Sequence, residues 1–284
     1  MTLAIFTVTD SERTAGMLAQ AASISVYKAL AEQGVAILRG LFLPAMIDAL
    51  HGEFAARFGN LDGATMEAMS RRPPPNPIQK NGDGRFEMVM RMCGGFGQPL
   101  LFANPILLNL LRPMLGGDLM RLASMTAVAS FPGAQQQHVH RDGTTLFGEF
   151  PNIDPALPPY AITAAIPLID VDQAIGPTGF WPGSHRWPAD RATQGAMLSV
   201  PFQRGDCLLV DYRTIHAGMA NNSRTVRPIL YMVYSREWFY DDVNHRQRSP
   251  LEIAAEDLQA LPPQLQLLML RARQHAVTRP PLSP

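Results

Sequence analysis

Short β-prone runs dominate the chain from Leu122 onward, and they constrain the fold more than any other feature of the 284-residue sequence. Val, Ile, Thr, Tyr and Phe favour strands, and the turn-forming residues between the runs predict reversals of the chain. Several such strands within about 115 residues predict an antiparallel sandwich or jelly roll. The runs are SMTAVASF (124–131), AITAAIPLI (161–169), AMLSVPF (196–202), CLLVDY (207–212) and VRPILYMVYS (226–235).

The first third of the chain has helical periodicity instead. We expect a helix that ends near Gly34, a short strand VAILRG, and helices over 43–59 and 104–115. Two stretches rich in Pro, Gly and Asn, 70–86 and 148–160, are expected to be loops.

The sequence has no internal repeat and no clean linker, which favours a single domain over 1–284. The predicted fold class is mainly β with flanking helices, built on a double-stranded β-helix (jelly-roll, cupin-like) core. The expected parts are a helical part over about 12–120, a jelly-roll core over about 121–240 and a C-terminal helix over about 250–274.

Charge and hydropathy restrict the partners that we expect. Twenty-four Lys and Arg balance 24 Asp and Glu, so the sequence indicates no nucleic-acid or polybasic membrane partner. No run approaches the roughly 18 apolar residues of a membrane span, and the N-terminus lacks a signal-peptide pattern. We therefore expect a cytoplasmic protein that acts on a small molecule, and the sequence leaves a homodimer open.

The stretch QQQHVHRDG (135–143) contains the first candidate for a metal site, His140-x-Asp142. A second His-x-acid pair, His51-x-Glu53, lies in a helical segment, where residues two apart do not face each other. At His140 the chain is extended or turning, so alternate side chains share a face and can converge on one ion. Because chance alone can produce such a pair, the motif needs a third ligand.

His216, in VDYRTIHAG after a buried strand, can supply that ligand. Two histidines and one carboxylate form the facial triad of non-heme Fe(II) oxygenases, which leaves coordination positions open. Taken alone, His216 could equally be a hydrogen-bonded histidine at a strand end. Arg227, eleven residues later, opens a strand on which Ile229 and Tyr231 share its face. A buried guanidinium needs an anionic partner, and the far carboxylate of a dicarboxylate cosubstrate can provide one.

The order His140-x-Asp142, then IGPTGFWPGSHRW (175–187), then RGDCLLVDYRTIHAGMANNSRTVRP resembles the phytanoyl-CoA dioxygenase family of Fe(II)/2-oxoglutarate oxygenases. ALAEQGVAILRGLFLPAMIDAL resembles that family's N-terminal helix–strand–helix, so the similarity covers roughly 29–240. The resemblance implies that His140, Asp142 and His216 bind Fe(II), and that Arg227 holds the distal carboxylate of 2-oxoglutarate. It implies cosubstrate contacts for Gln137 and Thr178, which could otherwise be a turn residue and a strand cap.

The expected function is therefore a dioxygenase that uses Fe(II), 2-oxoglutarate and O2 to oxidise an unactivated C–H of a small molecule. Hydroxylation is the expected outcome, with desaturation or rearrangement left open, and the resemblance is closest to members that modify natural products. Aromatic residues near the site suggest a largely apolar ligand, and Arg85 or Arg91 could meet an anionic group on it. The candidate substrate contacts are Phe147, Phe150, Trp238 and Arg91.

Two alternatives from other classes stay open on the sequence. One is a metal-dependent hydrolase or lyase on a cupin-like barrel, with Zn²⁺ or Mn²⁺ in the same ligands. The other is a non-catalytic ligand-binding protein on the same scaffold. Arg227 argues against the first, because hydrolysis needs no dicarboxylate, and the complete triad argues against the second.

Overall fold

Two β-sheets form the centre of the protein in the computed structural model, which describes residues 2–273 except 75, 144, 151, 189–192, 194 and 246–248. The large sheet has the strand order β1-β2-β8-β6-β10-β5-β4-β3, and its described pairs are antiparallel apart from β1 with β2. Its strands are β1 (Ile5–Thr7), β2 (Val35–Arg39), β3 (Ile78–Lys80), β4 (Arg85–Val89), β5 (Arg121–Ser130), β6 (Ala161–Pro167), β8 (Cys207–Asp211) and β10 (Arg227–Ser235). The small sheet pairs β7 (Thr178–Phe180) with β9 (His216–Gly218). The predicted fold class is confirmed.

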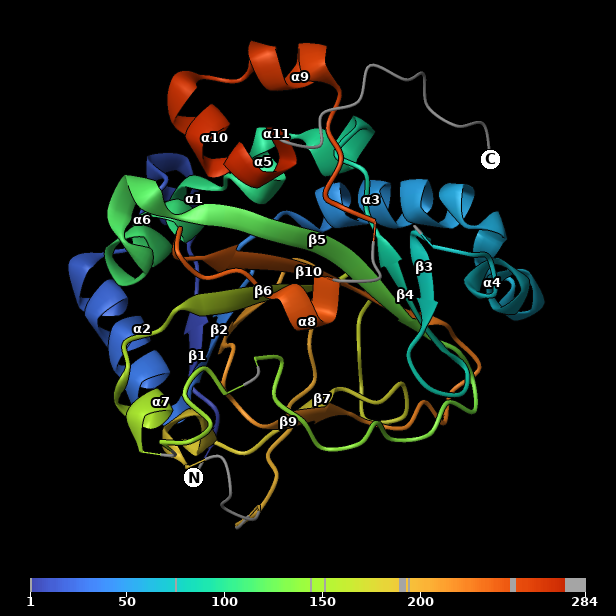
Figure 1. Ribbon diagram of the computed structural model, residues 1–284, viewed down its shortest axis with the longest axis horizontal. Helices are drawn as coiled ribbons and strands as arrows, with labels where there is room; N and C mark the ends of the chain where they lie inside the picture. Colours follow the sequence, from blue (N-terminus) through green and yellow to red (C-terminus); the bar gives the residue numbers. More distant parts are fainter. Residues whose placement is uncertain are drawn as a thin grey trace.

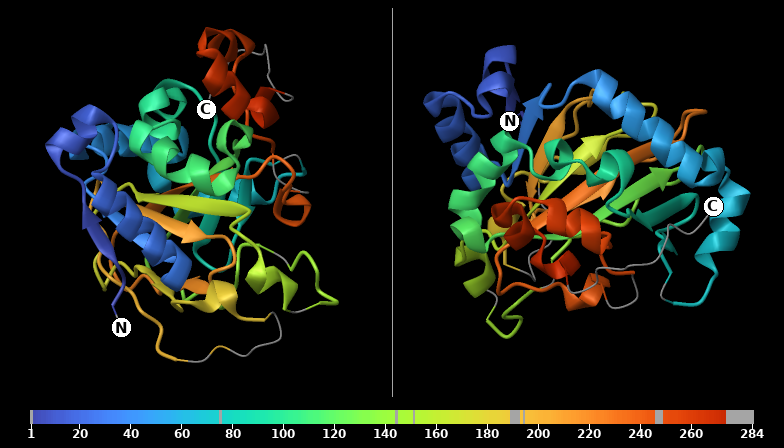
Figure 2. Two further views of the ribbon diagram at one scale, coloured as in Figure 1. Left: turned by 90° about the vertical axis from the view of Figure 1, so that its left-hand side faces the viewer. Right: turned by 90° about the horizontal axis from the view of Figure 1, so that it is seen from above.

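Helices cover one face of the large sheet, and the small sheet lies on the other side (Figure 1). Helix α2 packs on β2 and β8, α6 on β10, and the C-terminal α10 and α11 on β5 (Figure 2). The helices are α1 (Asp10–Ala15), α2 (Gln20–Gln33), α3 (Pro44–Arg57), α4 (Gly63–Ser70), α5 (Pro99–Phe102), α6 (Pro105–Leu115), α7 (Ile153–Ala156), α8 (Asp242–His245), α9 (Ala255–Ala260), α10 (Pro263–Leu268) and α11 (Leu270–Arg273). Along the described chain, no helix combines the length and apolarity that crossing a lipid bilayer requires.

The helix ends follow the local sequence. Gly34 ends α2 in the left-handed conformation, with φ of 74°, and its amide donates to the carbonyl of Leu30. Pro44 occupies the first turn of α3, where its missing N–H costs nothing. Asn104 caps α6 by accepting from two backbone amides. The predicted helix near Gly34 and the helix over 104–115 are present at these bounds.

Alternation along β10 separates the two faces of the large sheet. Leu230 and Met232 point into the core beneath the helices, while Ile229 and Tyr231 point toward the small sheet. Arg227 has the parity of Ile229 and is 1% exposed. The face shared by Arg227, Ile229 and Tyr231 is therefore the inner face of the jelly roll, as predicted.

Three segments differ from the sequence-based expectation. The expected loop 70–86 contains β3 and the start of β4, because its glycines form the tight turn of a hairpin. The expected strand 196–202 makes two isolated bridges, Leu198 with Phe180 and Phe202 with Val171, and no continuous ladder. In place of one C-terminal helix over 250–274, three short helices follow one another, since consecutive prolines at 262–263 end the first.

Candidate metal centre

Two backbone segments bring the predicted metal ligands together. His140 lies opposite His216, the first residue of β9, in an isolated antiparallel bridge. The amide of His140 donates to the carbonyl of His216 over 3.0 Å, and the amide of His216 donates back over 2.9 Å. Asp142 follows two residues later, so its side chain shares the face of His140. The bridge thus places the two imidazoles, 4.4 Å apart between ring centroids, beside one carboxylate.

Backbone carbonyls fix the orientation of both imidazoles. His140 Nδ1 lies 2.8 Å from the carbonyl oxygen of His138, and His216 Nδ1 lies 3.0 Å from that of Thr214. A carbonyl only accepts, so each Nδ1 carries the proton and each Nε2 presents a lone pair. Burial lowers the pKa of His140, with His216 lowering it further, which favours the neutral form that a metal ligand requires.

The three ligand atoms are close enough together to bind a single ion. His216 Nε2 lies 3.4 Å and His140 Nε2 3.9 Å from Oδ1 of Asp142, and all three ligand atoms lie within 4.8 Å of one another. Ligands about 2 Å from a shared ion lie at such separations. Among the described residues this is the one group of His, Cys, Asp and Glu with that arrangement. Two imidazoles and one carboxylate are the donors that non-heme Fe(II) prefers in a facial triad.

Asp142 is held from two sides. Thr163 on β6 directs its hydroxyl to Oδ2 of Asp142 at 3.4 Å. From α8, the side-chain amide of Asn244 donates to the backbone carbonyl of Asp142 over 2.8 Å and to Asp241 over 2.7 Å. Tyr212 also donates to Asp241, which ties α8 to the end of β8. The C-terminal segment therefore helps to fix the backbone of a metal ligand.

Two buried arginines lie on the same inner face of the large sheet. Ser130 on β5 pairs with Arg85 on one side and with Arg227 on the other, so the three side chains form one row across the sheet. Both arginines are 1% exposed, and neither forms an ion pair with a described residue. Arg85 Nη1, Arg227 Nε and the Ser130 hydroxyl lack hydrogen-bond partners in the described part of the chain. Such a row needs an anion.

The pKa values reflect the missing counter-charge. Burial lowers the pKa of Arg85 to about 10, and the proximity of Arg227 adds to the effect. Burial also lowers the pKa of Arg227. The bonds that do hold the guanidinium groups go to backbone carbonyls: Arg85 donates to Gln135 and Met219, and Arg227 donates to Gly176. These contacts orient the side chains without neutralising them, so the row is prepared for a carboxylate.

Gln137 and Thr178 connect the arginine row to the metal ligands. Gln137 accepts from the amide of Gly218 over 3.0 Å. A Cβ atom at Gly218 would lie 2.4 Å from Gln137 Oε1 and 2.9 Å from Arg85 Nη1, so only glycine leaves room for both polar groups. Thr178 pairs with Gly218 across the small sheet and hydrogen-bonds Tyr231.

Tyr231 lies between the charged groups and stays protonated. Burial raises the pKa of its hydroxyl, with Arg227 opposing and Asp142 reinforcing the shift. Its side chain lines the cavity over the triad, and its protonated hydroxyl is able to donate a hydrogen bond.

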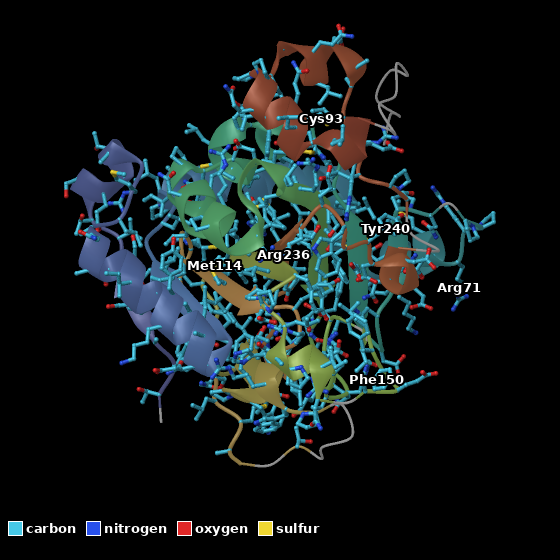
Figure 3. The ribbon with its side chains drawn as sticks, turned by 60° about the vertical axis from the view of Figure 1, so that its left-hand side comes forward. Arg71, Cys93, Met114, Phe150, Arg236 and Tyr240 are labelled. Carbon is cyan, nitrogen blue, oxygen red and sulfur yellow. The ribbon has the colours of Figure 1, made fainter. Side chains whose placement is uncertain are left out.

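A cavity of about 360 Å³ opens over the triad and contains Gln137, Thr178 and Tyr231 in its wall. None of the four predicted substrate contacts lines it. Phe147 and Trp238 are exposed, and Figure 3 shows Phe150 and Tyr240 at the molecular surface. Arg91 forms an ion pair with Glu252, at 2.9 Å. His138 lines the cavity without joining the triad.

Comparison with known proteins agrees with this geometry. A family model described as phytanoyl-CoA dioxygenase matches residues 30–229, which include the triad, the arginine row, Gln137 and Thr178. The chain belongs to the phytanoyl-CoA dioxygenase family. The resemblance predicted from the sequence is thereby confirmed, and α8 with Asn244 lies outside the matched region.

Curated relatives of this phytanoyl-CoA dioxygenase family member carry dioxygenase names. The Fe(II)/2-oxoglutarate-dependent dioxygenase nvfF of Aspergillus novofumigatus is 26% identical over 206 residues, 70% of this chain and 66% of its own length. Dioxygenase FUM3 of Gibberella moniliformis is 29% identical over 123 residues, 42% of this chain and 40% of its own. This chain thus spans slightly less than two thirds of the first relative and two fifths of the second. The predicted enzyme class and cofactors agree with these names and with the triad.

The fold is shared with a solved structure, the non-heme α-ketoglutarate-dependent epimerase SnoN from nogalamycin biosynthesis. The two structures align with a TM-score of 0.56 and 20% sequence identity, over 76% of this chain and 83% of the SnoN chain.

Sequence reasoning missed three contributors to this site. Arg85 was linked only to an anionic substrate, although alternation in RFEMV indicates a strand that begins with a buried arginine. Gly218 carries no signal of its own. Asn244 reaches the site through the tertiary fold, 102 residues after Asp142.

Proposed function

We propose that this protein is a non-heme Fe(II)/2-oxoglutarate-dependent dioxygenase that oxidises an unactivated C–H of a small molecule. The observation that carries the proposal is that the space between the two sheets holds both a His-Asp-His triad and, on the large sheet, two buried arginines without a described counter-ion. A hydrolase needs only the first of these. The cosubstrate 2-oxoglutarate has an α-keto acid for a metal and a distal carboxylate for a guanidinium, so it matches both.

His140, Asp142 and His216 would hold Fe(II), and Arg227 with Arg85 would hold the distal carboxylate of 2-oxoglutarate. When bound, iron and 2-oxoglutarate use O2 to convert the cosubstrate to succinate and CO2 and to oxidise the substrate. The hydroxyl of Ser130, between the two guanidinium groups, is positioned to donate to the same carboxylate. Gln137 and Thr178 would contact the remaining cosubstrate oxygens, as the family resemblance implies.

The protein's own side chains would contribute orientation and exclusion of water. The Nδ1–H bonds to Thr214 and His138 keep both Nε2 lone pairs directed at the ion. Burial keeps the hydroxyl of Tyr231 neutral, so it would form hydrogen bonds and would not act as an acid or base. The apolar side chains below the triad, among them Phe180 and Ile229, keep water from the cosubstrate side of the site.

Hydroxylation of a natural-product intermediate is the reaction that we favour, in keeping with the family members that the sequence resembles most. The sequence-based expectations of a cytoplasmic location and of a possible second copy in a homodimer stay predictions.

The experiment that tests the proposal measures ¹⁴CO2 released from 1-¹⁴C-2-oxoglutarate. Wild-type protein should release CO2 slowly without substrate, provided that both Fe(II) and O2 are present, and stoichiometric succinate should accompany it. His216→Ala should lose the reaction, whereas His51→Ala, which alters an exterior histidine of α3, should retain it. Release by His216→Ala at the wild-type rate would contradict the assignment.

A further inference from the structure

The inner face of β4 and β5 carries polar side chains at positions where a sheet interior is normally apolar. Glu87, Ser124 and Thr126 are 7%, 7% and 6% exposed, and all three line the cavity above the triad. We call these three residues the polar wall. On the other face of β5, Met125, Ala127 and Ala129 belong to the main apolar core. The polarity is therefore confined to the side of β5 that faces the cavity.

The two hydroxyls of the polar wall have no other assignment. Within the described ranges, neither the Ser124 nor the Thr126 hydroxyl donates to a carbonyl or side chain, and neither accepts from an amide or side chain. Both oxygens retain contact with the open cavity, since neither is sealed off from it. A buried hydroxyl that lacks a partner in the protein is costly unless a ligand or water satisfies it.

The two hydroxyls of the polar wall lie apart from the arginine row, whereas Glu87 lies two residues after Arg85 on β4. Ser130, in that row, lies four residues from Thr126 on β5, or about 13 Å along the strand. Ser124 instead pairs with Val233, which pairs with Thr163, and Thr163 contacts the metal ligand Asp142. Ser124 and Thr126 thus flank the metal at the end of the cavity away from the arginines, where a substrate rather than the cosubstrate would lie.

The rest of the cavity has the same character. Val128 and Val233 are its aliphatic members, and Asn81, Gln79 and Asn244 add amide groups. Aliphatic lining would favour a hydrocarbon, whereas a hydrocarbon in this cavity would leave the hydroxyls of Ser124 and Thr126 buried without hydrogen-bond partners. The predicted aromatic contacts lie outside the cavity, so the expectation of a largely apolar ligand loses its support.

We propose that the substrate is an oxygen-rich small molecule whose hydroxyl groups hydrogen-bond Ser124 and Thr126 while its target C–H faces the metal. The hydroxyls of Ser124 and Thr126 can each donate and accept, and a hydroxyl group on the substrate can meet both roles. The inference rests on the proposed function for the identity of the reacting centre. The reaction that supplies this substrate would accordingly be an earlier oxygenation or the assembly of an already hydroxylated skeleton.

Equilibrium dialysis against a graded series of ligands tests the proposal. The probes are small bicyclic ketones with zero, one, two or three hydroxyl groups, offered anaerobically to protein loaded with Fe(II) and 2-oxoglutarate. We expect affinity to rise with hydroxyl number, by at least about tenfold across the series. Ser124→Ala/Thr126→Val should remove most of that rise, while the control Ser25→Ala/Thr14→Val, at exposed helical hydroxyls, should keep it.

The visible absorption of the iron–cosubstrate complex, recorded on the same samples, separates two kinds of failure. Absence of that band in wild-type protein contradicts the proposed function, but it does not contradict the proposal that substrate hydroxyls hydrogen-bond the polar wall. With the band present, equal or tighter binding of the hydroxyl-free ketone overturns the polar-wall proposal. An unchanged hydroxyl preference in Ser124→Ala/Thr126→Val, or no binding by any probe, overturns it as well.

Discussion

Replacement of Arg85 by methionine gives the sharpest test of the arginine row. Its pKa is lowered from 12.5 to about 10, so the charged side chain costs the folded protein about 3 kcal/mol. Arg85→Met removes that cost and also removes two hydrogen bonds, to Gln135 and Met219, worth about 1.5–3 kcal/mol each. The two effects oppose each other, so the free energy of unfolding without cosubstrate should change by no more than about 3 kcal/mol.

Affinity for 2-oxoglutarate should respond much more strongly to Arg85→Met. Loss of one partner from a buried, charged hydrogen-bonded pair costs about 2–5 kcal/mol, which is at least about thirtyfold in Kd. Anaerobic titration of the Fe(II) protein would measure it. A parallel titration with 2-oxobutyrate, which lacks the distal carboxylate, should show little difference between wild type and variant.

The matched control is Arg91→Met, because Arg91 is 40% exposed at its side chain and pairs with Glu252 instead of a ligand. Its Kd for 2-oxoglutarate should stay within about twofold of wild type. If Arg85→Met bound 2-oxoglutarate as tightly as Arg91→Met, the assignment of the arginine row to the distal carboxylate would be refuted.

Three further predictions concern single contacts. Asn244→Ala, which frees the carbonyl of Asp142, should weaken Fe(II) binding by about 10- to 100-fold in a metal-competition assay, and wild-type affinity would refute the role of α8. Gly218→Ala should lower the affinity for 2-oxoglutarate, because the added methyl group displaces Gln137, and it should leave the affinity for Fe(II) unchanged. Equal losses of 2-oxoglutarate and Fe(II) affinity would contradict this role of Gly218. Burial lowers the pKa of His185 below 6.5, so the unfolded chain binds its proton more readily and stability falls as the pH drops below that value. His185→Gln should therefore flatten the decline in the free energy of unfolding between pH 7 and 5.5, by up to about 1.4 kcal/mol per pH unit, and an unchanged slope would disprove it.

The metal ligands were accessible to sequence reasoning because their geometry is local. His140 and Asp142 alternate on an extended segment, and His216 lies at the start of a strand, so parity alone places the side chains. The strand VRPILYMVYS likewise assigns Arg227 to the face of Ile229 and Tyr231, since alternate residues of a strand share a face.

Contacts that depend on the order of strands in the sheet, or on the segment that follows the last strand β10, could not be predicted from the sequence. Arg85 lies in one row with Arg227 because β5 pairs with both β4 and β10, and this strand order is not visible in the sequence. The turn-forming residues around Arg85 led to the prediction of a loop where β3 and β4 form a hairpin. Asn244 follows the last strand without any motif. Phe150 and Trp238 were expected in the pocket from closeness in sequence, yet both are more than half exposed. Closeness in sequence to the metal ligands thus gave a wrong prediction for these two residues, because the direction of their side chains does not follow from the sequence.

Anaerobic titration of the Fe(II) protein with 2-oxoglutarate, followed by visible absorption, tests the central assignment most directly. Wild-type protein should develop a weak, broad charge-transfer band that saturates at one equivalent of cosubstrate. His216→Ala should develop none, and Arg227→Ala should need a higher concentration to reach it. A folded, iron-loaded wild-type protein without any such band would contradict the account of this site.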